Sequence, residues 1–236
     1  MIRFKNVQVG YSKVLLEISD LVLKPGKVYA LIGRNGSGKS TLLKSMIGQL
    51  PLLNGQIELG SNQLTDLIKN HGQRAKEIAY VSSMFNGVEA LTLYQYVALG
   101  RLPYLGPLGR LNPEDEQNIA RVLRQLNLSE LAEVATQKLS DGERQLGSLA
   151  RAIVQDTPFM VLDEPASFLD YFNRDLLLAQ LEVWVQQDAN RTAIFSSHDI
   201  DLCLEKQIPL LILSNKSLKL MENANKESVM ELLTQS

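Results

Sequence analysis

Residues 33–41 read Gly-Arg-Asn-Gly-Ser-Gly-Lys-Ser-Thr, and this glycine-rich stretch constrains the fold of the chain more than any other feature. It fits the pattern G-x-x-x-x-G-K-[ST] of phosphate-binding loops at every fixed position. Residues 28–32 before it form an apolar run typical of a buried strand, and residues 42–47 after it are apolar at helical spacing. We therefore predict a strand, a glycine-rich turn and a helix, the context in which the pattern binds phosphate.

The residue types of this loop suit a nucleotide and its metal ion. Glycine lets the backbone bend round a phosphate chain, and amide N–H groups at the start of the next helix face the phosphates. Lys39 has the length to reach the β- and γ-phosphates, and the Ser40 hydroxyl suits Mg²⁺. The alternative, a turn that binds nothing, leaves the complete pattern unexplained. The predicted nucleotide-binding residues of the loop are Gly33, Asn35, Gly36, Ser37, Gly38, Lys39, Ser40 and Thr41.

Composition limits the partners and the compartment. The 236 residues allow one large domain with a sizeable core. A formal net charge of −2 offers no basic excess to a phosphate backbone, so we expect no nucleic acid partner. Cys203 is the single cysteine, which excludes an intramolecular disulfide and suits a reducing compartment. No apolar run reaches the ~20 residues of a membrane span and no signal peptide is expected, which favours the cytosol or the cytosolic side of a membrane.

Strand-like and helix-like segments alternate along the chain, which predicts a mainly parallel sheet covered on both faces. Strands are expected within 1–23 and at 28–32, 56–59, 78–81, 159–162, 193–195 and 210–213, with a hairpin return over 216–221. Helices are expected at 41–50, 92–99, 112–126, 142–154, 176–185 and 226–233, and a proline- and glycine-rich break at 100–113. Thr92 is a predicted N-cap, as is Asn112, which Pro113 follows at the first helical position.

Two acids, Asp163 and Glu164, directly follow the apolar residues 159–162. A buried strand that ends in an acid delivers it to the crevice where ligands bind in open α/β sheets. Asp163 is then placed to hold Mg²⁺ through water, and Glu164 to orient or deprotonate an attacking water. Taken alone, the pair fits an acidic helix cap better, but the phosphate loop upstream favours the hydrolytic interpretation.

Residues 139–145, Leu-Ser-Asp-Gly-Glu-Arg-Gln, offer a second anion site. Ser140 and Gly142 supply a hydroxyl and backbone amides at an expected helix N-terminus. One γ-phosphate needs only one cradle, so a second cradle suggests that another copy of the chain shares the nucleotide. The alternative is an ordinary helix with Ser140 as its N-cap, and propensity alone does not decide between them.

With these motifs the chain resembles an ATP-binding-cassette (ABC) ATPase subunit over nearly its whole length. Five motifs stand in the family's order: the phosphate loop at 33–41, the signature at 139–145 (usually Leu-Ser-Gly-Gly-Gln), the acidic strand at 161–164, the dimer-crossing loop at 167–170 and the switch histidine at 197–199. The resemblance implies an α/β phosphate-loop fold with a small antiparallel β-subdomain and an inserted helical subdomain. Residues 1–236 then form one nucleotide-binding domain, with the helical subdomain at about 88–155.

The resemblance also implies the roles of the site residues. Two ATP molecules with Mg²⁺ would lie in a head-to-tail dimer, each between the phosphate loop of one copy and Ser140 and Gly142 of the other. Ser40 and Asp163 would hold the metal. The implied catalytic residues are Glu164 as base, His198 against the γ-phosphate, and Lys39.

Two further positions follow from the family pattern. Asp170 ends the loop that crosses the dimer, and Tyr11 falls where the family stacks an aromatic ring on adenine. The alternatives are an exposed turn tyrosine for Tyr11 and a structural role for His198, since a lone histidine after a strand is commonly structural.

The chain departs from the family pattern at two positions. Asp141 stands where the signature usually has glycine, a change that we expect to be tolerated. Ser83 stands where the family usually has a glutamine that touches Mg²⁺ and the attacking water, and no glutamine follows until Gln95. A serine hydroxyl is too short to replace the amide without a bridging water, so slower hydrolysis or a different coupling contact is expected.

Residues 100–104 and 109–111 resemble the helical subdomain of the branch that drives bacterial uptake of iron–siderophore, haem and vitamin B12 compounds. This implies a separate transmembrane permease, held mainly by residues 84–89 and the helical subdomain, together with a substrate-binding protein. The chain would then sit peripherally on the cytoplasmic face of the membrane. Three alternatives stay open: a soluble cassette ATPase for iron–sulfur assembly, nucleic acid or translation, an exporter ATPase, and a regulatory clamp that hardly hydrolyses ATP.

Overall fold

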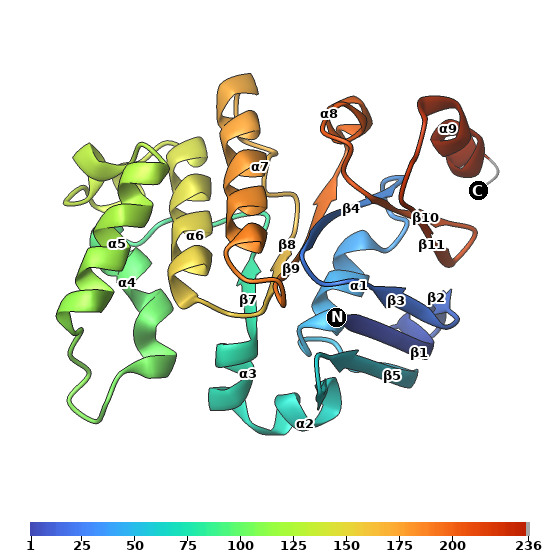
Figure 1. The fold of residues 1–236 in the computed structure, drawn as a ribbon, viewed down its shortest axis with the longest axis horizontal. Coiled ribbons are helices and arrows are strands. Elements are labelled where there is room, and N and C mark those ends of the chain that lie inside the picture. Colours follow the sequence, from blue (N-terminus) through green and yellow to red (C-terminus); the bar gives the residue numbers. More distant parts are fainter. Residues whose placement is uncertain (235–236) are drawn as a thin grey trace.

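The protein is described by a computed structural model that covers residues 1–234, so the last two residues of the predicted domain lie outside the described part. It has two sheets and a block of helices (Figure 1). The strands are β1 Ile2–Gly10, β2 Val14–Ile18, β3 Leu21–Leu23, β4 Lys27–Gly33, β5 Asn54–Leu59, β6 Asn62–Gln63, β7 Ile78–Val81, β8 Phe159–Leu162, β9 Thr192–Ser197, β10 Leu210–Ser214 and β11 Ser217–Met221. The helices are α1 Lys39–Met46, α2 Leu64–Lys69, α3 His71–Glu77, α4 Leu93–Ala98, α5 Pro113–Gln125, α6 Asp141–Gln155, α7 Tyr171–Gln186, α8 Ile200–Glu205 and α9 Lys226–Thr234, with 3₁₀ helices η1 Leu99–Tyr104, η2 Ser129–Leu131 and η3 Thr136–Lys138.

The larger sheet has six strands in the order β11-β10-β4-β9-β8-β7. All neighbours pair in parallel except β11, which returns antiparallel to β10 as a hairpin. Strands buried on both faces are apolar at consecutive positions, and β8 accordingly reads Phe-Met-Val-Leu with every residue buried. The predicted mainly parallel sheet and its terminal hairpin are therefore confirmed.

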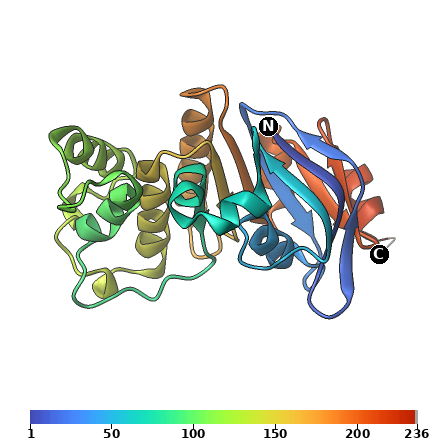
Figure 2. The ribbon, with the colours of Figure 1, turned by 90° about the horizontal axis from the view of Figure 1, so that it is seen from below.

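Strand β4 separates two hydrophobic cores, because successive side chains of a strand point to opposite faces. Val28 and Ile32 pack in the core that includes α6 and α7. Tyr29 and Leu31 pack in the other core, which includes α1 and the smaller sheet. That smaller sheet is antiparallel, in the order β2-β1-β5-β6 with β3 paired to β1. It lies at the opposite end of the molecule from the helical block (Figure 2).

The helical block consists of α4, η1, α5 and α6, and its helices begin where the sequence places their caps. Thr92, Asn112 and Ser140 each form a capping box with a residue three positions on, as expected for Thr92 and Asn112. Helix α6 runs beside β7, at the edge of the sheet (Figure 1). The Arg151 guanidinium donates a 3.0 Å hydrogen bond to the carbonyl of Tyr80 there, which fixes the helix to the strand.

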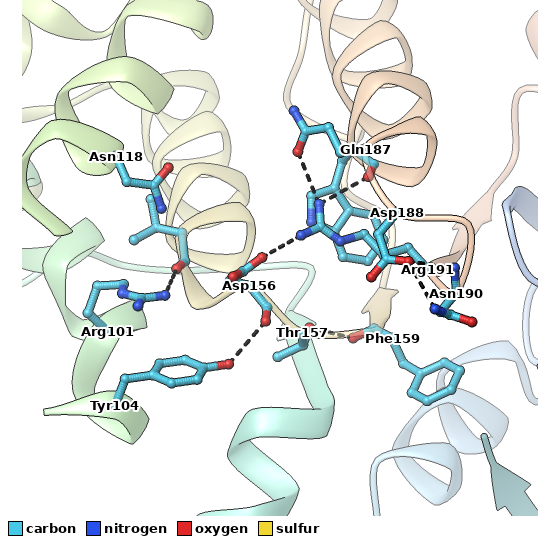
Figure 3. A network of polar contacts seen from close by, with 12 residues as sticks. Arg101, Tyr104, Asn118, Asp156, Thr157, Phe159, Gln187, Asp188, Asn190 and Arg191 are labelled. Carbon is cyan, nitrogen blue, oxygen red and sulfur yellow. Dashed lines mark hydrogen bonds and ion pairs between the residues drawn. The ribbon is translucent and has the colours of Figure 1, made fainter. Parts of the chain in front are cut away.

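A network of polar contacts centred on Asp156 joins the helical block to the large sheet (Figure 3). Asp156 ends α6 in the left-handed conformation, with φ 58°. Its carboxylate forms an ion pair with Arg191, and its carbonyl accepts a 3.0 Å hydrogen bond from the Tyr104 hydroxyl of η1. Arg191 in turn donates to the Trp184 carbonyl at 3.1 Å and to Gln187 at 3.0 Å. One residue thereby connects η1, α6 and the end of α7.

Three expected elements differ from the structure in extent, and one helix of the structure was not expected. Helix α8 was not predicted, because its six residues are too few to show helical periodicity. The expected break at 100–113 begins as η1, which tolerates Pro103 within a single 3₁₀ segment. Helix α1 ends at Met46, before the left-handed Gly48, and α7 begins at Tyr171 because Asp170 caps it through the Asn173 N–H at 2.8 Å.

Asp115→Ala is expected to lower the free energy of unfolding by roughly 3 kcal/mol, the lower end for breaking a buried ion pair. The Asp115 and Arg101 side chains are only 5% and 15% exposed and meet at 2.7 Å, so the variant leaves Arg101 buried without its partner. Chemical denaturation measures the loss. Glu114→Ala removes the neighbouring exposed acid of α5 and should change stability by less than about 0.5 kcal/mol. Equal losses in the two variants would contradict the assigned importance of the pair.

Candidate active site

The phosphate loop connects β4 to α1 and has the backbone of an anion cradle. Gly36 and Gly38 have φ angles of 76° and 104°, in the left-handed region that glycine adopts freely. No side chain of a described residue caps the start of α1, so its N–H groups remain available to a ligand. The buried Ser37 hydroxyl also has no hydrogen-bond partner among the described residues. A phosphate group would satisfy these donors.

Lys39 lies inside this loop rather than in solvent. Its ammonium donates to the carbonyls of Gly33 at 2.9 Å and Arg34 at 3.4 Å. Burial lowers the pKa of Lys39, while the charges of Glu164 and Asp163 act in the opposite direction. The lysine therefore lies within the field of both predicted acids, as the hydrolytic interpretation requires.

A cavity of about 600 Å³ adjoins the loop and has a volume that suits a nucleotide-sized ligand. It is lined by Leu15, Arg34, Asn35, Gly36, Ser37, Leu213, Ser214, Asn215 and Lys216. Ser40 and Thr41 follow in the first turn of α1, both half-buried. Tyr11 is 66% exposed in the turn between β1 and β2 and is not among the described residues that line the cavity.

The acids after β8 and the histidine after β9 lie together. Asp163 is 4% exposed, and its Oδ1 accepts a 2.8 Å hydrogen bond from the Ser196 hydroxyl. Glu164 adopts φ 47°, an uncommon conformation for a residue with a side chain. Its Oε1 lies 2.7 Å from Nε2 of His198, and its Oε2 accepts from Ser167 at 3.3 Å. The structure thus brings Asp163, Glu164 and His198 to one edge of the sheet.

Two polar residues that the sequence analysis did not single out, Ser196 and Arg174, support this group. Ser196 bridges the two acids, since it also accepts a 2.7 Å hydrogen bond from the Glu164 N–H. Arg174 of α7 donates to the Leu169 carbonyl at 2.8 Å and to Asp199 at 3.4 Å, so it links the loop after β8 to the loop after β9. Each residue lies within or beside a recognised motif, but its hydrogen bonds depend on the pairing of distant strands and helices.

The predicted second anion site is placed away from the phosphate loop. Ser140 and Gly142 begin α6 beside β7, and strands β8 and β9 lie between β7 and β4. The Glu143 carboxylate accepts hydrogen bonds from the Ser140 N–H at 2.7 Å and from its hydroxyl at 2.8 Å. Asp141 pairs with Arg144, and a Cβ on Gly142 would lie 3.2 Å from the Phe168 carbonyl. Gly142 therefore lies close to the loop that ends at Asp170.

Ser83 follows β7 in a loop attached to the same helix. Gln145 of α6 donates to the Ser82 carbonyl at 3.4 Å, and the Ser82 hydroxyl donates to the Met84 carbonyl at 2.9 Å. The following Phe85 ring stacks on Tyr96 with centroids 4.2 Å apart. The loop is therefore attached to α4 and α6, and Ser83, at the position of the usual glutamine, lies beside α6.

The family assignment rests on a model described as ABC transporter, which matches residues 16–167, more than half of the chain. The chain belongs to the ABC transporter ATPase family. The predicted family and fold are confirmed, and the protein is an ATPase that binds ATP.

Similar curated proteins include transport ATP-binding proteins for several cargoes. The chain is 34% identical to the achromobactin transport ATP-binding protein of Dickeya dadantii over 90% of this chain and 78% of that protein. It is 32% identical to the iron(3+)-hydroxamate import ATP-binding protein of Bacillus subtilis over 84% and 72%. It is also 30% identical to the molybdate import ATP-binding protein of Haemophilus influenzae over 86% and 74%.

Solved structures agree with the fold. A metal-chelate-type ABC transporter in an inward-facing conformation matches with a TM-score of 0.81 and 27% identity, over 99% of this chain and 88% of that one. A dimeric cassette bound to ADP and phosphate matches with a TM-score of 0.82 and 23% identity, over 95% of this chain and 100% of that one. Among the described residues of this ABC ATPase, no helix has the length and apolar character to span a membrane.

Lys39→Ala is expected to weaken ATP binding about ten- to hundredfold, because a charge-assisted hydrogen bond to phosphate is lost. Binding of a fluorescent ATP analogue measures the change. Lys44→Ala removes a lysine from the last turn of the same helix and should leave the affinity within about twofold. Equal affinities for the two variants would show that Lys39 does not contact the nucleotide.

Cys203 should react slowly with thiol reagents in the folded protein. It lines a cavity of about 110 Å³ behind His198, and burial raises the pKa of its thiol to about 12, while a Ser197 hydrogen bond lowers it and the Asp199 charge raises it. At pH 9 the folded thiol therefore stays protonated, whereas an unfolded cysteine with a pKa near 8.5 is mostly thiolate. We expect labelling by a disulfide reagent at pH 9 to be at least ~100-fold slower in native than in denatured protein. Equal rates would contradict the burial of this thiol.

Proposed function

We propose that this chain is the ATP-hydrolysing subunit of an importer that takes up a metal chelate of the iron–siderophore, haem or cobalamin type. The observation that carries the hydrolytic part is the group at the ends of β8 and β9, where Glu164 and His198 meet at 2.7 Å beside the buried Asp163. The named cargoes of its relatives support the metal-chelate class, and the molybdate import protein among them shows that related subunits also serve other cargoes.

Lys39 and the N–H groups of the loop bind the β- and γ-phosphates. Glu164 accepts a proton from the attacking water, whose oxygen bonds to the γ-phosphorus as the bond to the bridging oxygen of the β-phosphate breaks. His198 contacts the γ-phosphate, and its ring lies 2.7 Å from the Glu164 carboxylate. Tyr11 stacks on adenine at the rim of the cavity. These proposed roles combine the family assignment with the positions of the residues in this chain.

Mg²⁺ fits the oxygen donors of the site. Ser40 offers a half-buried hydroxyl, and Asp163 uses Oδ1 for Ser196 and keeps Oδ2 for a cation. No group of three or more His, Cys, Asp or Glu within residues 1–234 could hold a metal ion alone, so the phosphate oxygens would complete the coordination. When bound, the ion neutralises charge that develops on the phosphates.

We further propose a head-to-tail dimer in which Ser140 and Gly142 serve the partner's ATP and Asp170 lies in the crossing loop. The separation of Ser140 from the chain's own phosphate loop supports this, because two strands lie between them. Residues 1–236 would act as one nucleotide-binding domain. Its helical subdomain, at about 88–155, would move relative to the rest of the domain, to which the polar contacts of Asp156 join it.

The permease would bind the exposed apolar residues of this helical subdomain and of the loop after β7. Met84, Val88, Leu102 and Leu108 are exposed there. Such a subunit would lie peripherally on the cytoplasmic face of the membrane and would meet a substrate-binding protein only through the permease. Purification of the tagged chain from native membranes in mild detergent tests this part. A polytopic permease in near-equal amount is expected, whereas exclusively soluble partners would refute the importer.

Glu164→Gln should lower kcat for ATP hydrolysis at least ~100-fold. It should also trap an ATP-bound dimer, which a sizing column detects. The neutral amide keeps the shape of the side chain but accepts no proton from water. Glu205→Gln, an exposed change on α8, should leave both readouts unaltered. The same monomer elution of Glu164→Gln with and without ATP would count against the proposed dimer.

A further inference from the structure

Ser196 is the one described residue whose side chain hydrogen-bonds to both Asp163 and Glu164. It is 1% exposed and stands in β9, opposite Leu31 of β4. Its neighbour Phe195 pairs with Leu162, the last residue of β8, so Ser196 lies level with the start of the acidic pair. The strand register alone therefore brings its hydroxyl to the two acids.

The directions of the two hydrogen bonds are fixed by chemistry. The Glu164 backbone N–H can only donate, so the Ser196 oxygen accepts from it at 2.7 Å. The single hydroxyl proton is then left for Oδ1 of Asp163 at 2.8 Å. The serine thus orients one carboxylate and one peptide group simultaneously, and no other arrangement of its proton satisfies both partners.

Each bond constrains a different function of the site. The bond to Oδ1 fixes the rotation of the Asp163 carboxylate and leaves Oδ2 for the proposed cation. The bond to the Glu164 N–H supports a residue at φ 47°, a backbone conformation that is uncommon for residues with a side chain. The direction of the Glu164 carboxylate follows from that backbone.

We propose that Ser196 is a positioning residue for ATP hydrolysis. Its one hydroxyl orients both the cation-binding carboxylate of Asp163 and the proton-accepting carboxylate of Glu164. The proposal rests on the proposed roles of Asp163 and Glu164. It assigns to a residue of β9 an influence on metal affinity as well as on turnover.

A pair of variants with the same shape isolates the hydroxyl. Ser196 lines the cavity of about 110 Å³ behind His198, which offers space for one added methyl group. Ser196→Thr keeps the hydroxyl in that space, and Ser196→Val replaces it by a second methyl group. Thr192→Val makes the same exchange at the other end of β9, where the buried hydroxyl has no hydrogen-bond partner among residues 1–234, and serves as the control.

Ser196→Val is expected to lower kcat about ten- to hundredfold, the loss that accompanies a hydrogen bond to a charged group. Electron paramagnetic resonance of Mn²⁺, with a non-hydrolysable ATP analogue present, should show the dissociation constant of the cation raised about tenfold. Affinity for ATP in EDTA should remain within about twofold, because the phosphate loop is intact. Ser196→Thr and Thr192→Val should keep all three values within about threefold of the parent protein.

Equal kcat and Mn²⁺ affinity in Ser196→Val and Ser196→Thr would overturn the proposal. Loss of ATP binding in EDTA by both Ser196→Val and the smaller Ser196→Ala would also overturn it, since the hydroxyl would then serve the fold as a whole. Glu164→Gln, measured in parallel, separates the two hypotheses. Its full activity would refute the proposed role of Glu164, whereas its inactivity beside an unaffected Ser196→Val would refute only the role of Ser196.

Discussion

The parallel pairing of β4, β9 and β8 determines where every group of the candidate active site lies. Leu31 pairs with Ser196 and Leu162 with Phe195, so the three strands end almost level with one another. The phosphate loop, the acidic pair and the histidine each follow one of these ends. Because carboxyl ends of parallel strands share an edge, a shift in register would separate groups that now lie within hydrogen-bond distance.

Polar contacts between the loops position the side chains of the candidate active site more closely than strand pairing alone does. Ser196 fixes both acids, and Arg174 holds the loop after β8 against the loop after β9. The direct contact of Glu164 with His198 connects the loop after β8 to the loop after β9 a second time.

The sequence predicted the fold class because its signals are local and complete. The phosphate loop, the apolar strand before Asp163 and the caps at Thr92 and Asn112 each depend on a few neighbouring residues. The sequence also indicated which motifs belong together, through their order in a known family. The chemical roles of these motifs remain predictions from the sequence. The structure adds the distances between their residues.

What the sequence did not predict depends on contacts between distant segments. The bridging position of Ser196 follows from strand register, and the hub at Asp156 follows from the meeting of η1, α6 and the turn before β9. Neither residue carries a local pattern that distinguishes it from an ordinary serine or aspartate. Helix α8 was not predicted for a different reason, since its six residues are too few to show helical periodicity.

The side chains that fix α6 to β7 have a consequence for solubility. Strand β7 ends the large sheet, and an edge strand with free carbonyl groups is a template for strands of other molecules. Gln155 donates to the Ile78 carbonyl at 3.1 Å and Arg151 to that of Tyr80 at 3.0 Å, so helical side chains occupy the acceptors that a foreign strand would need. The contact that orients the helical block thereby also protects the protein against aggregation by strand addition.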